Sequence, residues 1–167
     1  MTINRRELIL ARLQERMMSV PGVAEVDGVK SVFRNRGAVP DELRPAIVVL
    51  DGREVLVTTI SQQHREMPPA IMRVLPQIWV LVRARDNVNN DTLDNQSAPI
   101  GEELSAWQVK VQGAIYGDEV LLGLLGDSGG IDWQGLDTDL EAAAEMTGEL
   151  LLNFGFRYYF NPAEVIG

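Results

Sequence analysis

The closing segment of the chain constrains the fold more than any other part of the sequence. From residue 150 to residue 160, apolar side chains occupy alternate positions. Successive side chains of a β-strand point to opposite faces, so this period of two predicts a strand of about a dozen residues ending at Asn161–Pro162. We interpret its aromatic face as core rather than as a binding platform, because the helices of the chain need a sheet face to cover. The alternating set is Leu150, Leu152, Phe154, Phe156, Tyr158 and Phe160.

The first half of the chain predicts one helix followed by strands. Asn4 and Glu7 have the spacing of a helix N-cap and its capping-box partner, and apolar residues then recur at helical intervals, which predicts a helix over residues 5–19. VKSVFRNRG has a weak strand pattern, and the loop AVPDELRP leads from it to the apolar run AIVVL. Because Asp51–Gly52 separates AIVVL from REVLVTT, we expect a β-hairpin at this pair. A polar connection with prolines at 68, 69 and 76 then leads to QIWVLVRAR, residues 77–85, whose alternation predicts another strand.

The second half predicts two helices and a return to strands. One helix is expected to end near Tyr116–Gly117, and Asp118 opens a short leucine-rich helix that ends at Gly126. Residues 131–141 have the pattern of an irregular strand, and residues 141–148 are expected to form a loop or a turn of helix. The apolar stripe of the longer helix consists of Leu104, Trp107, Val111, Ala114 and Ile115.

The order of these elements predicts an α+β fold. We expect a single domain over residues 1–167, in which helices pack on one face of a mostly antiparallel β-sheet. Residues 86–97 are polar and rich in Asn and Asp, and a segment of this length without secondary structure is the best candidate for a flexible functional loop.

The charge and composition of the chain narrow the classes of function. The formal net charge is −9 and the sequence pI is about 4.6, so a nucleic-acid backbone would be repelled unless basic residues gathered on one face. The chain has no cysteine, which excludes disulfides and thiolate zinc sites and fits assembly in a reducing cytosol. Neither a signal peptide nor a membrane-spanning segment is predicted.

The pentapeptide GDSGG, residues 126–130, resembles the surroundings of the nucleophilic serine in trypsin-like proteases. Such a serine needs a histidine base and an oriented aspartate, and the single histidine of this chain, His64, lacks the sequence setting of that base. Glycines readily take the positive φ that ends helices. We therefore expect Ser128 to lie in a turn between a helix and a strand, and a small serine hydrolase stays open as a remote alternative.

No other motif predicts catalysis, a cofactor or a metal. Paired carboxylates at Glu102–Glu103 and Asp118–Glu119 are best explained as helix N-termini, where negative charge complements exposed N–H groups. Asp137 and Asp139 are expected to face solvent together on a strand, and the loop that begins at Asp86 lacks the glycine and glutamate of an EF-hand. Phosphate-binding and dinucleotide-binding glycine motifs are absent from the sequence. We expect no enzyme activity, no cofactor and no metal.

Read in order, these segments resemble the tail terminator (tail completion) family of long-tailed bacteriophages and related gene transfer particles. The resemblance covers nearly the whole chain. It rests on the opening helix ARLQERMMSVPGV, on FRNRG with the acidic segment PDELRPAIVVLDGRE, on LPQIWVLV, on the amphipathic helix around Trp107, on the short helix before LLGDSGGI, and on WQGLDTDLE and LLLNFGFRYYFNPAEV.

The resemblance implies a virion structural protein that forms a hexameric ring with itself in the tail neck, after assembly in the host cytoplasm. Such a ring ends elongation of the tail tube, contacts the tube protein and the head–tail connector or stopper, and lets DNA pass its lumen without specific binding. Alternatives are another neck component, such as a connector subunit, or a tail-tube protein. From charge and position, the candidate assembly contacts are Arg34, Arg36, Asp51, Arg53, Glu54, Asp86, Asn90 and Asp91.

Overall fold

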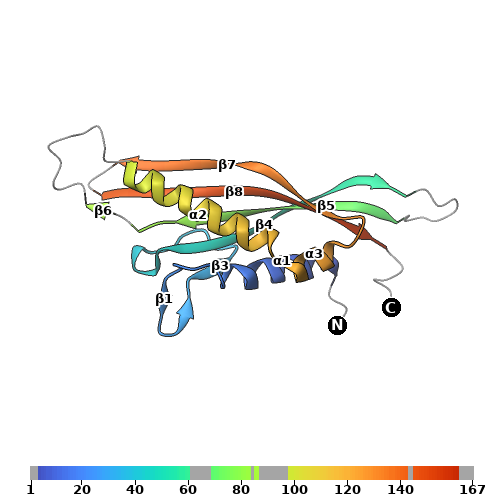
Figure 1. Cartoon of the computed structure of the whole chain (residues 1–167), viewed down its shortest axis with the longest axis horizontal. Helices are drawn as coiled ribbons and strands as arrows, with labels where there is room; N and C mark the ends of the chain where they lie inside the picture. The colour runs from blue at the N-terminus through green and yellow to red at the C-terminus, as the bar shows by residue number, and fades with distance from the viewer. Residues whose placement is uncertain (1–3, 61–68, 84, 87–97, 143–144, 162–167) are drawn as a thin grey trace.

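The chain folds into a twisted, mostly antiparallel β-sheet with three α-helices on one face, which confirms the predicted α+β class (Figure 1). The computed structural model describes residues 4–60, 69–83, 85–86, 98–142 and 145–161. The helices are α1 (Arg5–Met17), α2 (Ala98–Tyr116) and α3 (Glu119–Leu125), with a 3-10 turn, η1, at Asp41–Leu43. The strands are β1 (Glu25–Val26), β2 (Val29–Lys30), β3 (Val32–Arg34), β4 (Ala46–Thr59), β5 (Ala70–Leu81), β6 (Arg85–Asp86), β7 (Gly130–Ala142) and β8 (Glu145–Phe160).

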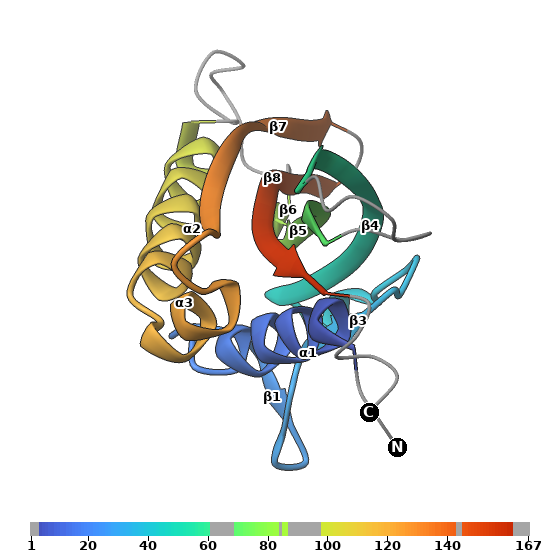
Figure 2. The same cartoon turned by 90° about the vertical axis from the view of Figure 1, so that its right-hand side faces the viewer.

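The main sheet is built around four long strands, β4, β5, β7 and β8. Its order is β3-β4-β5-β8-β6, and β7 also pairs with β8. The short strand β3 runs parallel to β4, and every other pairing in the sheet is antiparallel. Viewed along its long axis, the sheet is strongly curved, and the helices lie along one side of it (Figure 2).

Local sequence signals set the helix ends. Asn4 caps α1 by accepting a hydrogen bond from the backbone N–H of Glu7 at 2.8 Å, as predicted, and the helix ends at Met17, two residues before the expected limit. Asp118 caps α3 in the same way, and Gly126 ends that helix with a φ of 73°.

The principal core lies between the helices and one face of the sheet. Aromatic and aliphatic residues of β8 meet the apolar stripes of all three helices there, which confirms that the alternating face is core. Phe154, Phe156 and Tyr158 are buried, and Phe160 packs against the core while partly exposed. The opposite face of the sheet is covered at one end by a second cluster built from Val39, Ala46, Val48 and Leu81.

The expected hairpin at Asp51–Gly52 is wrong. Strand β4 runs straight through this pair, and the register shifts there because Asp51 and Gly52 together oppose a single residue of β5, Pro76. Such an extra residue is a β-bulge, and proline, which cannot donate to the sheet, is tolerated in a strand at a bulge. Gly52 has a φ of 65°, and a Cβ on it would lie 1.8 Å from the carbonyl oxygen of Leu75.

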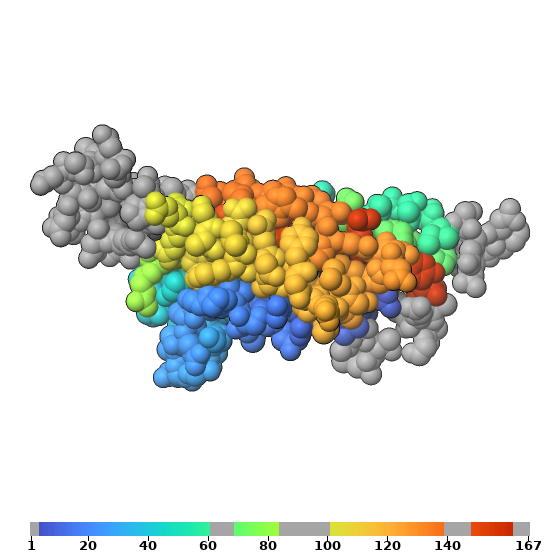
Figure 3. All heavy atoms as spheres, viewed as in Figure 1, coloured from blue at the N-terminus to red at the C-terminus, as the bar shows by residue number. Residues whose placement is uncertain are grey.

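A hairpin does form at the other Asp-Gly pair of the chain. Asp27 and Gly28 have φ values of 52° and 78° and connect β1 to β2. This small hairpin projects from the body of the molecule (Figure 3). Sequence reasoning missed it, although Val26 and Val29 flank the pair as a hairpin requires.

Two other boundaries differ from expectation. Strand β5 begins at Ala70 rather than near Gln77, because the bulge accommodates Pro76 within it. Of the predicted loop or helical turn at 141–148, residues 141–142 end β7 and residues 145–148 begin β8. Antiparallel pairing of Glu141 with Thr147 and of Ala142 with Met146 places the described part of this segment in strands.

Candidate interaction surface

Two of the predicted contact residues belong to an internal ion cluster. Arg34 on β3 donates from Nε and Nη2 to both carboxylate oxygens of Asp51 at 2.6 and 2.8 Å, and from Nη2 to Glu7 of α1 at 2.8 Å. Hydrogen bonds from this guanidinium hold the pKa values of Glu7 and Asp51 below their ordinary range. Arg34 therefore links Glu7 of α1 to Asp51 of β4 and holds the helix against the edge of the sheet.

Arg36 and Glu54 also have partners inside the chain. The guanidinium of Arg36 lies 4.4 Å from the ring centroid of Phe33, and its Nε donates to the carbonyl of Ala38. Glu54 lies on the helix side of β4, where its carboxylate accepts a hydrogen bond from the hydroxyl of Tyr158. Burial raises the pKa of Glu54.

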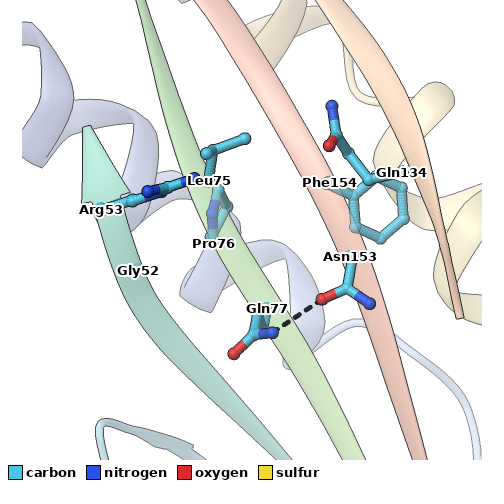
Figure 4. A pocket seen from close by; sticks show the side chains of 8 residues that line it. All are labelled: Gly52, Arg53, Leu75, Pro76, Gln77, Gln134, Asn153 and Phe154. Carbon is cyan, nitrogen blue, oxygen red and sulfur yellow. Dashed lines mark hydrogen bonds between the residues drawn. The ribbon is translucent and has the colours of Figure 1, made fainter. Parts of the chain in front are cut away.

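Among the predicted contact residues whose side chains the structure describes, Arg53 is the one left free to contact another molecule. It is exposed, and the structure gives it no hydrogen bond or ion pair with the described residues. Together with Gly52, it lines a groove of about 390 Å³ on the sheet face opposite the helices (Figure 4). Gln77 and Asn153 lie in the floor of this groove, joined by a hydrogen bond of 2.7 Å.

Beside the groove, two arginines share one carboxylate. Arg73 on β5 and Arg157 on β8 are direct cross-strand partners, and their Nε atoms lie 3.1 and 2.9 Å from Oδ2 of Asp132 on β7. Sequence reasoning missed this cluster because its members are far apart along the chain. Only Arg157 stood out in the sequence, as a polar residue within the alternation of the last strand.

The second half of β4 forms an exposed edge of the sheet. Strand β3 pairs only with Ile47–Val49, and among the described residues no strand pairs with the outer side of β4 from Arg53 to Thr59. Leu56, Val57 and Ile60 leave 57, 42 and 40% of their surface exposed along this edge. Both β4 and β5 extend beyond the helices at this end of the molecule (Figure 1).

The opposite side of the sheet also ends in an unpaired strand. In the described part of the chain, β7 pairs with β8 alone over residues 130–142. Gly135, with a φ of 103°, lies at a register shift in β7, and the neighbouring residues Trp133 and Leu136 are partly exposed. The sheet therefore has two long open edges, formed by different segments.

Of the remaining predicted contact residues, the structure describes only Asp86. Asp86 falls in the two-residue strand β6, whereas Asn90, Asp91 and the rest of the predicted loop from 87 to 97 lie outside the described residues. Ser128 is exposed in the turn between α3 and β7, as predicted. His64 also lies outside the described residues, so the structure does not place the base that a serine nucleophile would need.

The paired carboxylates Glu102 and Glu103 do not open a helix as predicted, because α2 begins at Ala98 and has no acidic residue in its first turn. Asp118 caps α3 as predicted, and Asp137 accepts a 3.5 Å hydrogen bond from Asn153 on the face opposite the helices. The described residues contain no group of three or more His, Asp or Glu side chains arranged to hold a metal ion. None of the helices in the described part of the chain is long and apolar enough to cross a membrane.

Comparison with known proteins identified no relative of this chain. The sequence matches no protein-family model and no curated protein.

Proposed function

We propose that this protein is a structural subunit of a bacteriophage tail neck, which forms a ring at the head-proximal end of the tail tube. In this role it ends elongation of the tube and supplies the joint to the head connector or stopper. The order of its sequence segments supports this proposal through the family resemblance. The α+β fold, with helices on one face of an antiparallel sheet, agrees with the fold that the resemblance implies.

The observation that best supports an assembly role is the pair of open sheet edges. An unpaired strand presents a row of free N–H and C=O groups, and soluble proteins usually blunt such edges with charges, prolines or covering segments. From Leu56 to Ile60 the β4 edge has no charged residue, and apolar side chains are exposed along it. An edge of this kind is suited to pairing with another chain.

The two edges are different surfaces, which favours a ring over a two-fold dimer. A dimer with two-fold symmetry would join the same edge of both subunits. Pairing of β4 from one copy with β7 of the next is instead a head-to-tail contact, and such contacts close into rings when the rotation between subunits allows it. Closure would cover both of these long edges, including the uncharged part of β4 from Leu56 to Thr59.

Tube assembly provides the decisive experiment. Purified protein is sized by light scattering and imaged by negative stain, alone and with tail-tube protein. A ring at one end of each tube, with elongation stopped, is the expected result. Elongation of the tube by this protein would identify a tube subunit instead, and a strict monomer in both conditions would refute the proposal.

The edge itself is tested with two lysine substitutions. Leu56→Lys places a charge on the open edge, and Val109→Lys places the same charge on α2, at a side chain that is 70% exposed. Both variants are expected to fold, because both positions lie at the surface. Only Leu56→Lys should abolish ring formation, whereas loss of rings in Val109→Lys alone would place the subunit contact on the helices.

A further inference from the structure

We propose that the helix-free face of the sheet binds phosphate groups of a nucleic-acid backbone through Arg53, Arg73 and Arg157. The binding is a property of the single chain and does not depend on ring formation. The orientation of this face toward DNA in a tail, in contrast, rests on the proposed function.

The register of the sheet brings the three arginines to one face. Leu152, Phe154, Phe156 and Tyr158 of β8 point toward the helices, so the intervening Arg157 points away from them. Arg73 is its direct cross-strand partner on β5, and Arg53 on β4 pairs with Leu75, two residues along from Arg73. The three side chains therefore occupy neighbouring strands, which are spaced about 4.8 Å apart.

The charges of this cluster are not balanced. Asp132 is the carboxylate that Arg73 and Arg157 share, and Arg53 has no ion pair with the described residues. Within this cluster three guanidinium groups face one carboxylate, although the same face also carries Asp137, which accepts a hydrogen bond from Asn153 of the adjoining groove. Like charges placed directly across a strand pair destabilise a sheet, so the pairing of Arg73 with Arg157 has a cost that Asp132 offsets only in part.

The side chains of Arg73 and Arg157 pack directly over glycine residues of the neighbouring strands. A Cβ on Gly155 would be 3.0 Å from Cδ of Arg73, and a Cβ on Gly130 would be 2.8 Å from Nη2 of Arg157. The side chains therefore lie flat across β8 and β7 rather than extending into solvent. Their side chains keep 31 and 36% of their surface exposed, and because Nε of Arg73 is buried, a ligand would contact that residue through its Nη groups.

Hydrogen bonding within the cluster is incomplete. Nε of Arg73 is buried and makes no hydrogen bond, although it lies 3.1 Å from Oδ2 of Asp132. Asp132 therefore holds Arg73 in place without saturating its donors. The planar fork of a guanidinium matches phosphate oxygens two at a time, which makes arginine the residue best suited to this anion.

The shape of the surface favours an extended polyanion over a small ligand. The arginines lie on a sheet face rather than in an enclosed pocket, and the adjoining groove runs past Arg53 to the amides of Gln77 and Asn153. Arg53, Arg73 and Arg157 all lie on strands of the sheet face rather than on a helix or loop that could enter a DNA groove and read base edges. Contact is therefore expected with backbone phosphates, without sequence specificity.

A local cluster of arginines allows a chain of net charge −9 to contact DNA despite the overall repulsion between them. Overall repulsion keeps binding weak, whereas the local surplus of arginine provides a few contacts that form and break as DNA moves past. Binding of this kind depends strongly on salt, because each phosphate contact releases counterions.

The test measures binding of a fluorescent 20-base-pair duplex to the free protein by anisotropy over a series of salt concentrations. Arg53→Gln and Arg157→Gln are compared with Lys110→Gln, which removes one positive charge from an exposed position on α2. Each arginine variant should weaken binding and reduce the slope of log K against log salt by about one. Asp132→Asn, which removes the single carboxylate, should tighten binding several-fold.

Competition distinguishes the possible anions. An unlabelled duplex should displace the probe, whereas inorganic phosphate and polyglutamate at equal charge concentration should displace it poorly. Efficient displacement by inorganic phosphate would identify a single-ion site, and equal displacement by polyglutamate would identify a surface for acidic protein segments. Either result, or an equal loss of binding in Lys110→Gln, would overturn the proposal. Thermal unfolding of each variant establishes that the change is not a loss of fold.

Discussion

Arg12 and Asp118 form a two-bond ion pair that fastens α1 to the start of α3. Nε and Nη2 of Arg12 each donate to one oxygen of Asp118 at 2.8 Å, and the same carboxylate accepts the backbone N–H of Val120. One side chain therefore both caps a seven-residue helix and anchors it to a helix more than 100 positions earlier in the sequence.

Substitutions at Asp118 should separate these two roles. Asn is as effective an N-cap as Asp, so Asp118→Asn loses the charge of the ion pair but keeps the cap. Asp118→Ala loses both, and we expect it to reduce the free energy of unfolding by about 1 kcal/mol more than Asp118→Asn does. Urea unfolding measures the difference, and equal losses in the two variants would show that the cap contributes nothing.

Stability should decrease in acid through the Arg34 cluster. The pKa values of Glu7 and Asp51 are lowered in the folded state, chiefly by hydrogen bonds from Arg34. The unfolded chain therefore binds more protons in acid, so this stabilisation is complete above the ordinary carboxylate pKa values of about 4 and is lost as pH falls through the folded-state values.

Arg34→Met should flatten this acid limb when urea unfolding is repeated between pH 3 and pH 7. Arg36→Met is the matched control, because Arg36 contacts the ring of Phe33 and the carbonyl of Ala38 rather than a carboxylate. An unchanged pH dependence in Arg34→Met would show that other carboxylates cause the acid limb.

Gly52→Ala should be among the most damaging single substitutions. The new Cβ would lie 1.8 Å from the carbonyl oxygen of Leu75, so the bulge opposite Pro76 could not form as it is. We expect a loss of about 4 kcal/mol or more. Gly126→Ala is the control with a similar φ of 73° but open space around the Cβ, and it should cost about 1 to 3 kcal/mol in thermal or urea unfolding through backbone strain alone. Similar losses in both would mean that backbone strain, rather than crowding, dominates.

Ser128→Ala should leave the protein unchanged. The side chain is exposed in a turn, so the free energy of unfolding should change by less than about 0.5 kcal/mol. A screen for ester and peptide hydrolysis accompanies the stability measurement. Hydrolysis that disappears in this variant would support the serine hydrolase alternative.

Of the two glycines that follow Ser128, Gly129 is the one that must lack a side chain, because the backbone around it is crowded. The sequence left open whether Gly130 has a positive φ. In the structure its φ lies outside the left-handed region, and a Cβ there would meet only the flexible end of Arg157. A Cβ on Gly129 would lie 2.3 Å from the carbonyl oxygen of Leu125 and 2.4 Å from that of Arg157. Gly129→Ala should therefore destabilise the chain far more than Gly130→Ala, and the reverse order in urea unfolding would contradict this packing.

Signals that act over a few residues were read correctly from the sequence. The Asn4 cap, the Asp118 cap and the alternation of the last strand each depend on neighbours within one helical turn or one strand. The two Asp-Gly pairs show that the same local signal can give different structures. Asp27–Gly28 makes a hairpin, whereas Asp51–Gly52 makes a bulge, because the partner strand β5 brings Pro76 opposite it.

The sequence by itself determined the helices, the aromatic face of β8 and the α+β class, because hydrophobic period and capping chemistry are local properties. Only the tertiary structure decided which charges meet. Arg34 looked available for a partner but is held by Glu7 and Asp51, while Arg73, Asp132 and Arg157 converge from three strands. Strand register sets these encounters, and register depends on pairing between segments as far apart as Ala70 and Phe160, which no local pattern encodes.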